Sequence, residues 1–198
     1  MSRIGIPFTV CPADVDESMP VSANPAVVAG TLARTKAEAI RLTETDCAII
    51  AADTVVVFAG VLLGKPKDPD EARQMLRGLR DETHQVLTAV VVMPAGRRSA
   101  LARYPETTVR MRCYSDEEIE GSITRGDPFD KAGGYAIQDE SLRPVEVYEG
   151  CYCNVVGLSL WTAIELLKRA EVNIPFVSAE QLLPQCAVCP LSPVRQAT

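Results

Sequence analysis

The fold is decided by residues 48–67, which read AIIAADTVVVFAGVLLGKPK. Apolar and β-branched side chains fill residues 48–63, and Asp53 carries the only charge there. This run predicts a buried strand, and Ala59-Gly60 predicts a tight turn into a second strand that delivers Lys65. A carboxylate in such a strand must be hydrogen-bonded, protonated, paired with a cation or bound to a metal. Alternatively, Asp53 has a structural role only, and Thr54 or nearby backbone groups satisfy its carboxylate with hydrogen bonds.

Helix signals lie on both sides of this hairpin. Asn24 as N-cap and Pro25 in the first turn predict a helix that runs to about Leu42. Lys36 falls among its apolar positions, where the ammonium either reaches water or enters a cleft. Asp68 opens a second helix, and further strands and helices are predicted between residues 85 and 167. These elements predict an α/β fold with a mixed sheet flanked by helices, without the strict alternation of a doubly wound sheet.

Prolines at 175, 184, 190 and 193 interrupt the sequence after about residue 173. Because proline breaks helices and central strands, we expect an irregular C-terminal tail over 173–198 and one domain over 1–172. The first residues, up to Val10, resemble the end of a helix followed by a strand.

Composition excludes several classes of protein. The 198 residues hold 20 Lys plus Arg against 26 Asp plus Glu, a net charge of −6, which argues against a partner that is a nucleic-acid polymer. The apolar run at 48–63 is too short to span a membrane, and no signal peptide is visible, so a soluble cytoplasmic protein is expected. Four of the five lysines, at 36, 65, 67 and 131, lie beside the motifs below. They indicate an anionic ligand, with scattered surface lysines as the alternative.

Two groups of residues are candidate metal ligands. Asp14-Val15-Asp16-Glu17 is either a solvated acidic turn or a source of oxygen ligands for a hard divalent cation. The seven cysteines, without secretory features, indicate reduced thiols rather than disulfides. CYC at 151–153 and CAVC at 186–189 leave open a four-thiolate zinc site, although only the second pair has zinc-finger-like spacing.

Several motifs follow one another along the chain. They are GIPF at 5–8, DVDE at 14–17, LARTKA at 32–37, ADTVV at 52–56, LGKP at 63–66, THQV at 83–86, YSDEEI at 114–119, DKAGGYAIQ at 130–138 and NVVGL at 154–158. In this order, over roughly residues 4–170, they resemble the Maf family of nucleoside triphosphate pyrophosphatases. The resemblance implies a Maf/inosine-triphosphatase-like α/β fold with a substrate cleft between two lobes. It also implies hydrolysis of a nucleoside triphosphate to the monophosphate and pyrophosphate, dependent on Mg²⁺ or Mn²⁺.

The resemblance also assigns site residues. Asp53 would accept the proton of the attacking water, and Asp16 would hold the metal together with Asp53, with Glu17 close by. Lys36 and Lys65 would bind the phosphates, because phosphoryl transfer needs cations that neutralise developing charge. A nucleoside triphosphate is the expected partner, membranes are not expected, and a homodimer stays open.

Two positions resemble the dTTP/UTP subgroup of the family, namely Thr54 after the aspartate and Gln138 at the end of the glycine-containing motif. The subgroup that resembles 7-methyl-GTP pyrophosphatases usually has glutamine and glutamate at these places, so pyrimidine substrates are expected. Strict alternation puts Asp53 and Thr54 on opposite faces of the strand. If both reach the cleft, the strand is expected to end or bulge there.

The sequence departs from the family pattern twice. The family's opening strand with Ser-x-Ser-Pro-Arg-Arg, which contacts the substrate phosphates, has no match near residue 1. We therefore expect either an N-terminally truncated gene model or an impaired relative that binds nucleotides or a cell-division partner. Asp139-Glu140-Ser141 replaces the usual glycine-containing loop, which brings acid near the end of the cleft that would recognise the base.

Overall fold

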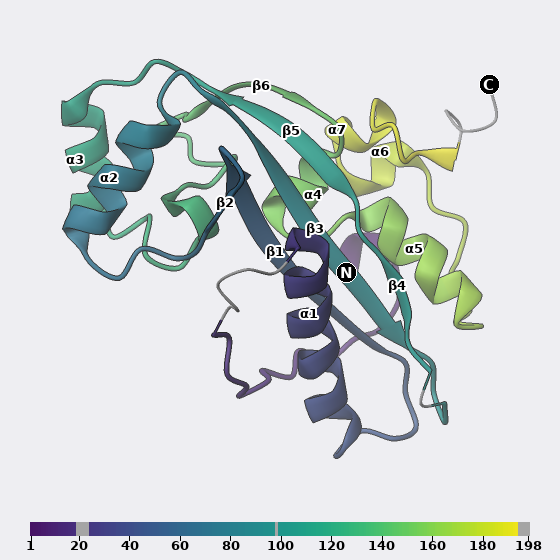
Figure 1. The fold of residues 1–198 in the computed structure, drawn as a ribbon. Coiled ribbons are helices and arrows are strands. Elements are labelled where there is room, and N and C mark those ends of the chain that lie inside the picture. Colours follow the sequence, from purple (N-terminus) through teal and green to yellow (C-terminus); the bar gives the residue numbers. More distant parts are fainter. Residues whose placement is uncertain (19–23, 98, 194–198) are drawn as a thin grey trace.

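A six-stranded antiparallel sheet forms the centre of the computed structural model, which describes residues 1–18, 24–97 and 99–193 (Figure 1). The order is β2-β1-β3-β5-β6, and β4 also pairs with β3. The strands are β1 Ile49–Phe58, β2 Val61–Leu63, β3 Thr83–Met93, β4 Leu101–Arg103, β5 Glu106–Met111 and β6 Val145–Glu149. The predicted α/β class is confirmed. The sheet was expected to be mixed, but each strand pairing in the described residues is antiparallel.

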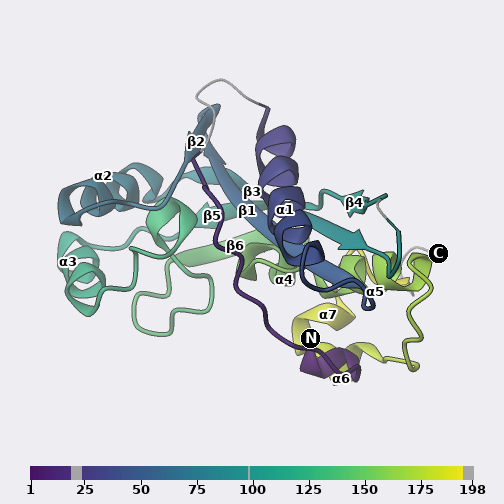
Figure 2. The ribbon, with the colours of Figure 1, turned by 90° about the horizontal axis from the view of Figure 1, so that it is seen from below.

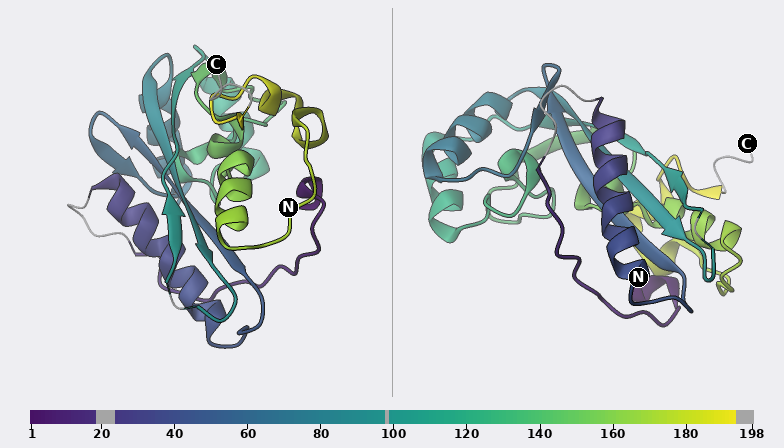
Figure 3. Two further views of the ribbon diagram at one scale, coloured as in Figure 1. Left: turned by 90° about the vertical axis from the view of Figure 1, so that its right-hand side faces the viewer. Right: turned by 60° about the horizontal axis from the view of Figure 1, so that its bottom comes forward.

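Helices cover both faces of the sheet. They are α1 Pro25–Arg41, α2 Pro69–Leu79, α3 Asp116–Arg125, α4 Tyr152–Val156, α5 Leu160–Arg169, α6 Ala179–Leu182 and α7 Pro184–Ala187, with 3-10 turns at Ser2–Ile4 and Ala132–Gly134. Seen along the sheet, α1 lies against one face and α5 against the other (Figure 3). None of the described helices is long and apolar enough to cross a membrane.

The predicted caps fix the helix starts. Asn24 Oδ1 accepts a hydrogen bond from the Ala26 amide at 2.9 Å, and Asp68 Oδ1 accepts one from the Glu71 amide at 2.8 Å. Each bond satisfies an amide of the first turn that has no partner inside the helix. α1 therefore begins as predicted and ends at Arg41, one residue before the predicted end. The strand expected before Val10 is absent, because residues 5–18 hold neither helix nor strand.

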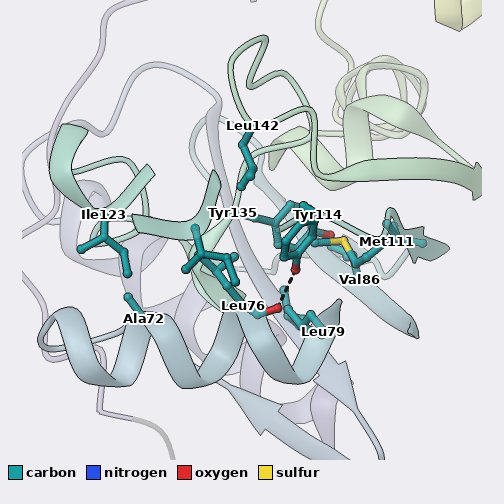
Figure 4. Close-up of a cluster of buried hydrophobic side chains, with 12 residues drawn as sticks. Ala72, Leu76, Leu79, Val86, Met111, Tyr114, Ile123, Tyr135 and Leu142 are labelled. Carbon is teal, nitrogen blue, oxygen red and sulfur yellow. Dashed lines mark hydrogen bonds between the residues drawn. The ribbon is translucent and has the colours of Figure 1, made fainter. Parts of the chain in front are cut away.

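Alternation along β1 divides the core in two. Val55 packs with α1 and β3, whereas Val56 packs with α2, α3 and the other face of β3. In the second cluster Tyr114 Oη donates to the Leu76 carbonyl oxygen at 2.6 Å (Figure 4). The α2–α3 pair thus forms one lobe beside the sheet and α1 belongs to the other (Figure 1). The predicted cleft between two lobes follows from this division.

The chain after residue 173 is more regular than its prolines predicted. α6 and α7 are single turns, and Pro184 occupies the first position of α7, where its missing amide hydrogen costs nothing. Leu182 and Cys186 are buried in a cluster with α5, and Arg3 Nη1 donates to the Leu182 carbonyl oxygen at 2.6 Å. The 3-10 turn at the N-terminus therefore lies beside α6 (Figure 2). The domain boundary at residue 172 stays a prediction.

Candidate active site

A cavity of about 450 Å³ lies where the two lobes meet. Its walls come from α1, the middle of β1, the end of β2, the 130–138 loop and the C-terminal end of α4; Glu17 also lines it. Pockets for small ligands in proteins usually have volumes of about 300–1,000 Å³. This cleft therefore has the size of a small-molecule site.

The 130–138 loop reaches the cleft through a close backbone contact. The Gly133 amide donates to the Gly64 carbonyl oxygen at 3.0 Å, and Gly133 has a φ of 73°. A Cβ at Gly133 would lie 3.3 Å from the Val56 side chain, and this φ is strained for other residues. The paired glycines of the motif thus bring Ala136 and Gln138 to the cavity.

Lys36 links the charged groups of the cleft. Its Nζ lies 2.6 Å from Asp53 Oδ1 and 2.6 Å from Glu17 Oε1. Lys65 Nζ lies 2.9 Å from Glu17 Oε2, so the two lysines share one carboxylate. The Asp53 side chain is 12% exposed and that of Lys36 is 21% exposed. Pairing with a cation is therefore how the strand accommodates its carboxylate.

The environment shifts the pKa of each of these groups. Burial raises the pKa of Asp53 above its ordinary value, and the hydrogen bond from Lys36 only partly offsets this. Burial lowers the pKa of Lys36, but hydrogen bonds to Asp53 and Glu17 outweigh it, so the net shift is upward. Hydrogen bonds from Lys36 and Lys65 lower the pKa of Glu17 to about 2. Asp53 thus has a higher proton affinity than an ordinary aspartate, as suits a group that accepts a proton.

Asp53 and Thr54 both line the cleft although they project from opposite faces of β1. β1 pairs with β3 without a break over residues 49–57, so the expectation that the strand ends or bulges here is wrong. On its other side β1 pairs with β2 only over residues 56–58. In the described part of the chain the edge at 49–55 therefore has no strand beside it. The cleft follows this free edge, which side chains from both faces can reach.

Thr54 is held from the sheet face opposite α1. Its Oγ1 lies 2.8 Å from Thr88 Oγ1, and Thr88 Oγ1 donates to the Asn154 carbonyl oxygen at 2.8 Å. Asn154 Nδ2 donates to the Val86 carbonyl oxygen at 2.9 Å, which ties α4 to β3. Sequence reasoning used Asn154 only as part of a motif and gave it no role. Its position three residues before Gly157, the glycine that ends α4, is the signal that the sequence offers.

The structure does not bring every predicted residue into the cleft. Asp16 is exposed, its Oδ1 accepts hydrogen bonds from Ser18, and it does not line the cavity. Glu17, its neighbour in the acidic loop, takes the place in the cleft that Asp16 was expected to have. A metal-binding role for Asp16 stays a prediction.

At the end of the cleft that was expected to recognise the base, Gln138 lines the cavity and is exposed. Asp139, the acidic residue that follows Gln138, is not part of the cavity wall. Its Oδ1 accepts from the amides of Ser141 at 2.8 Å and Leu142 at 3.0 Å. The departure from the family pattern after Gln138 therefore leaves this part of the cleft without the added charge of Asp139.

The donor set suits a hard divalent cation. Asp53 and Glu17 both present carboxylates to the cleft, and Mg²⁺ is commonly held by one or two carboxylates together with substrate phosphates. Among the residues that the structure describes, no group of three or more His, Cys, Asp or Glu side chains is arranged as a metal site. A metal here would therefore bind with the substrate rather than in a cage made by the protein alone.

Comparisons with known proteins identify the family. The family model described as Maf-like protein matches residues 1–170. A dTTP/UTP pyrophosphatase from Thermomicrobium roseum is 50% identical over 194 residues, which cover 98% of this chain and 88% of that protein. One of the same name from Halalkalibacterium halodurans is 43% identical over 169 residues, 85% of this chain and 87% of that protein. The chain therefore belongs to the Maf family.

Proposed function

We propose that this chain hydrolyses nucleoside triphosphates, with dTTP and UTP as substrates, to the monophosphate and pyrophosphate. The observation that carries the proposal is the partly buried Asp53 in a cleft that also holds Lys36 and Lys65. Similarity to relatives named dTTP/UTP pyrophosphatase supports the same reaction. The binding-only alternative has no support among these relatives.

Asp53 accepts the proton of the attacking water in this proposal. Water adds to the α-phosphorus, the bond from that phosphorus to the bridging oxygen breaks, and pyrophosphate leaves. Loss of a proton to Asp53 makes the water a better nucleophile, and the raised pKa of Asp53 favours that transfer. The aspartate must be unprotonated to act, which its ion pair with Lys36 promotes.

The two lysines act on the phosphates. Charge in the transition state is spread over phosphate oxygens, so fixed ammonium groups in a partly desolvated cleft stabilise it. Lys36 is the better placed of the two, because its side chain is 21% exposed whereas that of Lys65 is 54% exposed. A less exposed charge is less screened by water and salt.

A divalent cation, Mg²⁺ or Mn²⁺, completes the proposal. Asp53 and Glu17 would hold it, because both carboxylates line the cleft and are close enough to share the Lys36 ammonium. Asp16 is less suitable than Glu17, since its Oδ1 accepts hydrogen bonds from Ser18 and it does not line the cleft. When bound, the ion would supply further neutralisation of charge on the phosphates.

The test is pyrophosphate release by the purified chain from dTTP, UTP, CTP and 7-methyl-GTP, with Mg²⁺ or Mn²⁺ and with excess EDTA. We expect turnover of dTTP and UTP with either metal, weaker turnover of the other two nucleotides, and loss of activity in EDTA. Absence of pyrophosphate release with every nucleotide and metal would refute the proposed reaction. Preference for 7-methyl-GTP would refute the assignment of the substrate.

Gln138→Glu should lower kcat/KM for UTP by about tenfold or more. An amide both donates and accepts, so it can pair with the N3–H and O4 of uracil, whereas a carboxylate only accepts and repels O4. Cytosine presents an amino group as donor instead, so the ratio of kcat/KM for UTP to that for CTP should fall. Steady-state kinetics with both nucleotides measure this ratio.

Gln74→Glu is the matched control for this variant. Gln74 is exposed on α2 and does not line the cleft, so the substitution adds the same charge elsewhere. An unchanged ratio in Gln138→Glu, or an equal change in both variants, would show that Gln138 does not read the base.

A further inference from the structure

Four cysteines meet outside the cleft. Cys151 and Cys153 flank the start of α4, while Cys186 lies in α7 and Cys189 just after it. All four are buried, with exposed fractions of 1–3%. Cys153 Sγ lies 3.6 Å from Cys186 Sγ, and Cys151 and Cys189 belong to the same buried cluster. Two pairs that are distant in the sequence thus form one group of sulfur atoms.

The distance between two of the sulfur atoms distinguishes a disulfide from free thiols and from ligands of one metal ion. A disulfide requires about 2.05 Å between sulfur atoms, so the 3.6 Å between Cys153 and Cys186 is that of free thiols. In a tetrahedral zinc site with bonds of about 2.3 Å, neighbouring sulfur atoms lie about 3.8 Å apart. The observed separation therefore matches two thiolates on one zinc ion.

We propose that Cys151, Cys153, Cys186 and Cys189 bind one structural Zn²⁺. In the described residues no group of three or more candidate ligands, these four cysteines included, is already arranged as a metal site. Rotation about the Cα–Cβ bond moves Sγ without moving the backbone, and this is the adjustment that binding would use. Binding converts four thiols to thiolates and releases four protons to solvent.

A cation and polar groups border the cluster. Arg3, whose Nη1 donates to the Leu182 carbonyl oxygen at 2.6 Å, places its guanidinium near Cys186. The Ser159 hydroxyl oxygen lies 3.6 Å from Cys151 Sγ and donates its own hydrogen to Thr162 Oγ1 at 2.9 Å. The nearby guanidinium would offset part of the excess negative charge of a four-thiolate zinc site.

The site would fasten the C-terminal segment to the wall of the cleft. α4 carries the first cysteine pair and continues into residues 155–157, which line the cavity. In the described part of the chain after residue 173 the helices are two single turns, so a cross-link would add to the packing that holds this segment in place. Trp161, the only tryptophan, donates from Nε1 to the Cys186 carbonyl oxygen at 3.1 Å and so reports on this region.

The experiment measures metal content in the full chain, purified without chelator from cells grown with zinc. We expect about one zinc per chain by elemental mass spectrometry. Exchange into Co²⁺ should give the absorption bands of tetrahedral cobalt bound to thiolates. Removal of the metal by a strong chelator should change the Trp161 fluorescence. None of these readouts depends on enzymatic activity, so failure here is distinct from failure of the proposed reaction.

Cys186→Ser/Cys189→Ser should lose the zinc, and the single variant Cys153→Ser serves as a second test if the double variant does not fold. Cys11→Ser/Cys47→Ser is the matched control, because both residues are exposed and outside the cluster. It should retain the metal. Wild-type protein without zinc would overturn the proposal, as would zinc that the double variant retains. A Cys153–Cys186 disulfide detected by alkylation and mass spectrometry would also overturn it.

Discussion

Asp53→Asn should abolish turnover of dTTP and UTP, with kcat reduced by about 10³-fold or more, while the fold is preserved. The loss expected from removing a general base is about 10²- to 10⁴-fold, and the amide is also a poor ligand for a divalent cation. Asparagine keeps the shape of the side chain, and its oxygen still accepts the hydrogen bond that Lys36 donates to Asp53 at 2.6 Å. The measurement is pyrophosphate release at saturating substrate, together with a thermal unfolding curve.

Asp46→Asn controls for the loss of one carboxylate. Asp46 is exposed before β1 and does not line the cleft, so its replacement should leave kcat unchanged. Asp53→Asn with wild-type kcat would remove Asp53 from the mechanism. A large fall in the melting temperature of Asp53→Asn would mean that the aspartate stabilises the fold, which is the alternative to a functional role.

Local signals in the sequence were sufficient for most of the architecture. The β1–β2 hairpin turns at Ala59-Gly60 as predicted, and the helix starts at Asn24 and Asp68 follow their caps. These features depend on contacts within a few residues, which is why a sequence pattern specifies them. The strand expected near Val10 failed because a short apolar run without a partner strand has nothing to fix it.

The arrangement of the cleft depends on contacts that no local pattern contains. The sequence left open whether Asp53 is hydrogen-bonded, protonated, paired with a cation or bound to a metal. Only the packing of α1 against β1 selects the pairing with Lys36. Alternation correctly placed Asp53 and Thr54 on opposite faces, but the free strand edge that lets both reach the cavity is a property of the whole sheet. For the same reason the sequence could not decide between Asp16 and Glu17.

The C-terminal segment illustrates a different limit. Its prolines indicated an irregular tail, yet Pro184 begins a helical turn and Cys186 and Cys189 are buried. Apolar side chains between the prolines, such as Leu182, fill a core formed with α5 and the N-terminal turn. Proline frequency reports where regular structure is interrupted; it does not report whether the interrupted segments pack.

Lys36→Met should lower kcat/KM for dTTP and UTP by about 10²- to 10³-fold, the loss typical for one fixed group that stabilises transition-state charge. Methionine keeps the apolar stem within α1 but removes the ammonium that contacts both Asp53 and Glu17. Without it, the main group that offsets the burial of Asp53 is lost and the pKa of Asp53 rises further, so protonation of the aspartate is favoured as well. The variant therefore loses phosphate binding and part of its general base together.

Lys65→Met should have a smaller effect, about tenfold or less and mainly on KM, because the side chain is 54% exposed and pairs only with Glu17 among the described residues. Lys67→Met is the matched control, since Lys67 is exposed two residues away and does not line the cleft. Steady-state kinetics of the three variants give the ranking. Equal effects of Lys36→Met and Lys67→Met would show that overall charge, rather than the position of Lys36 between the two carboxylates, governs the reaction.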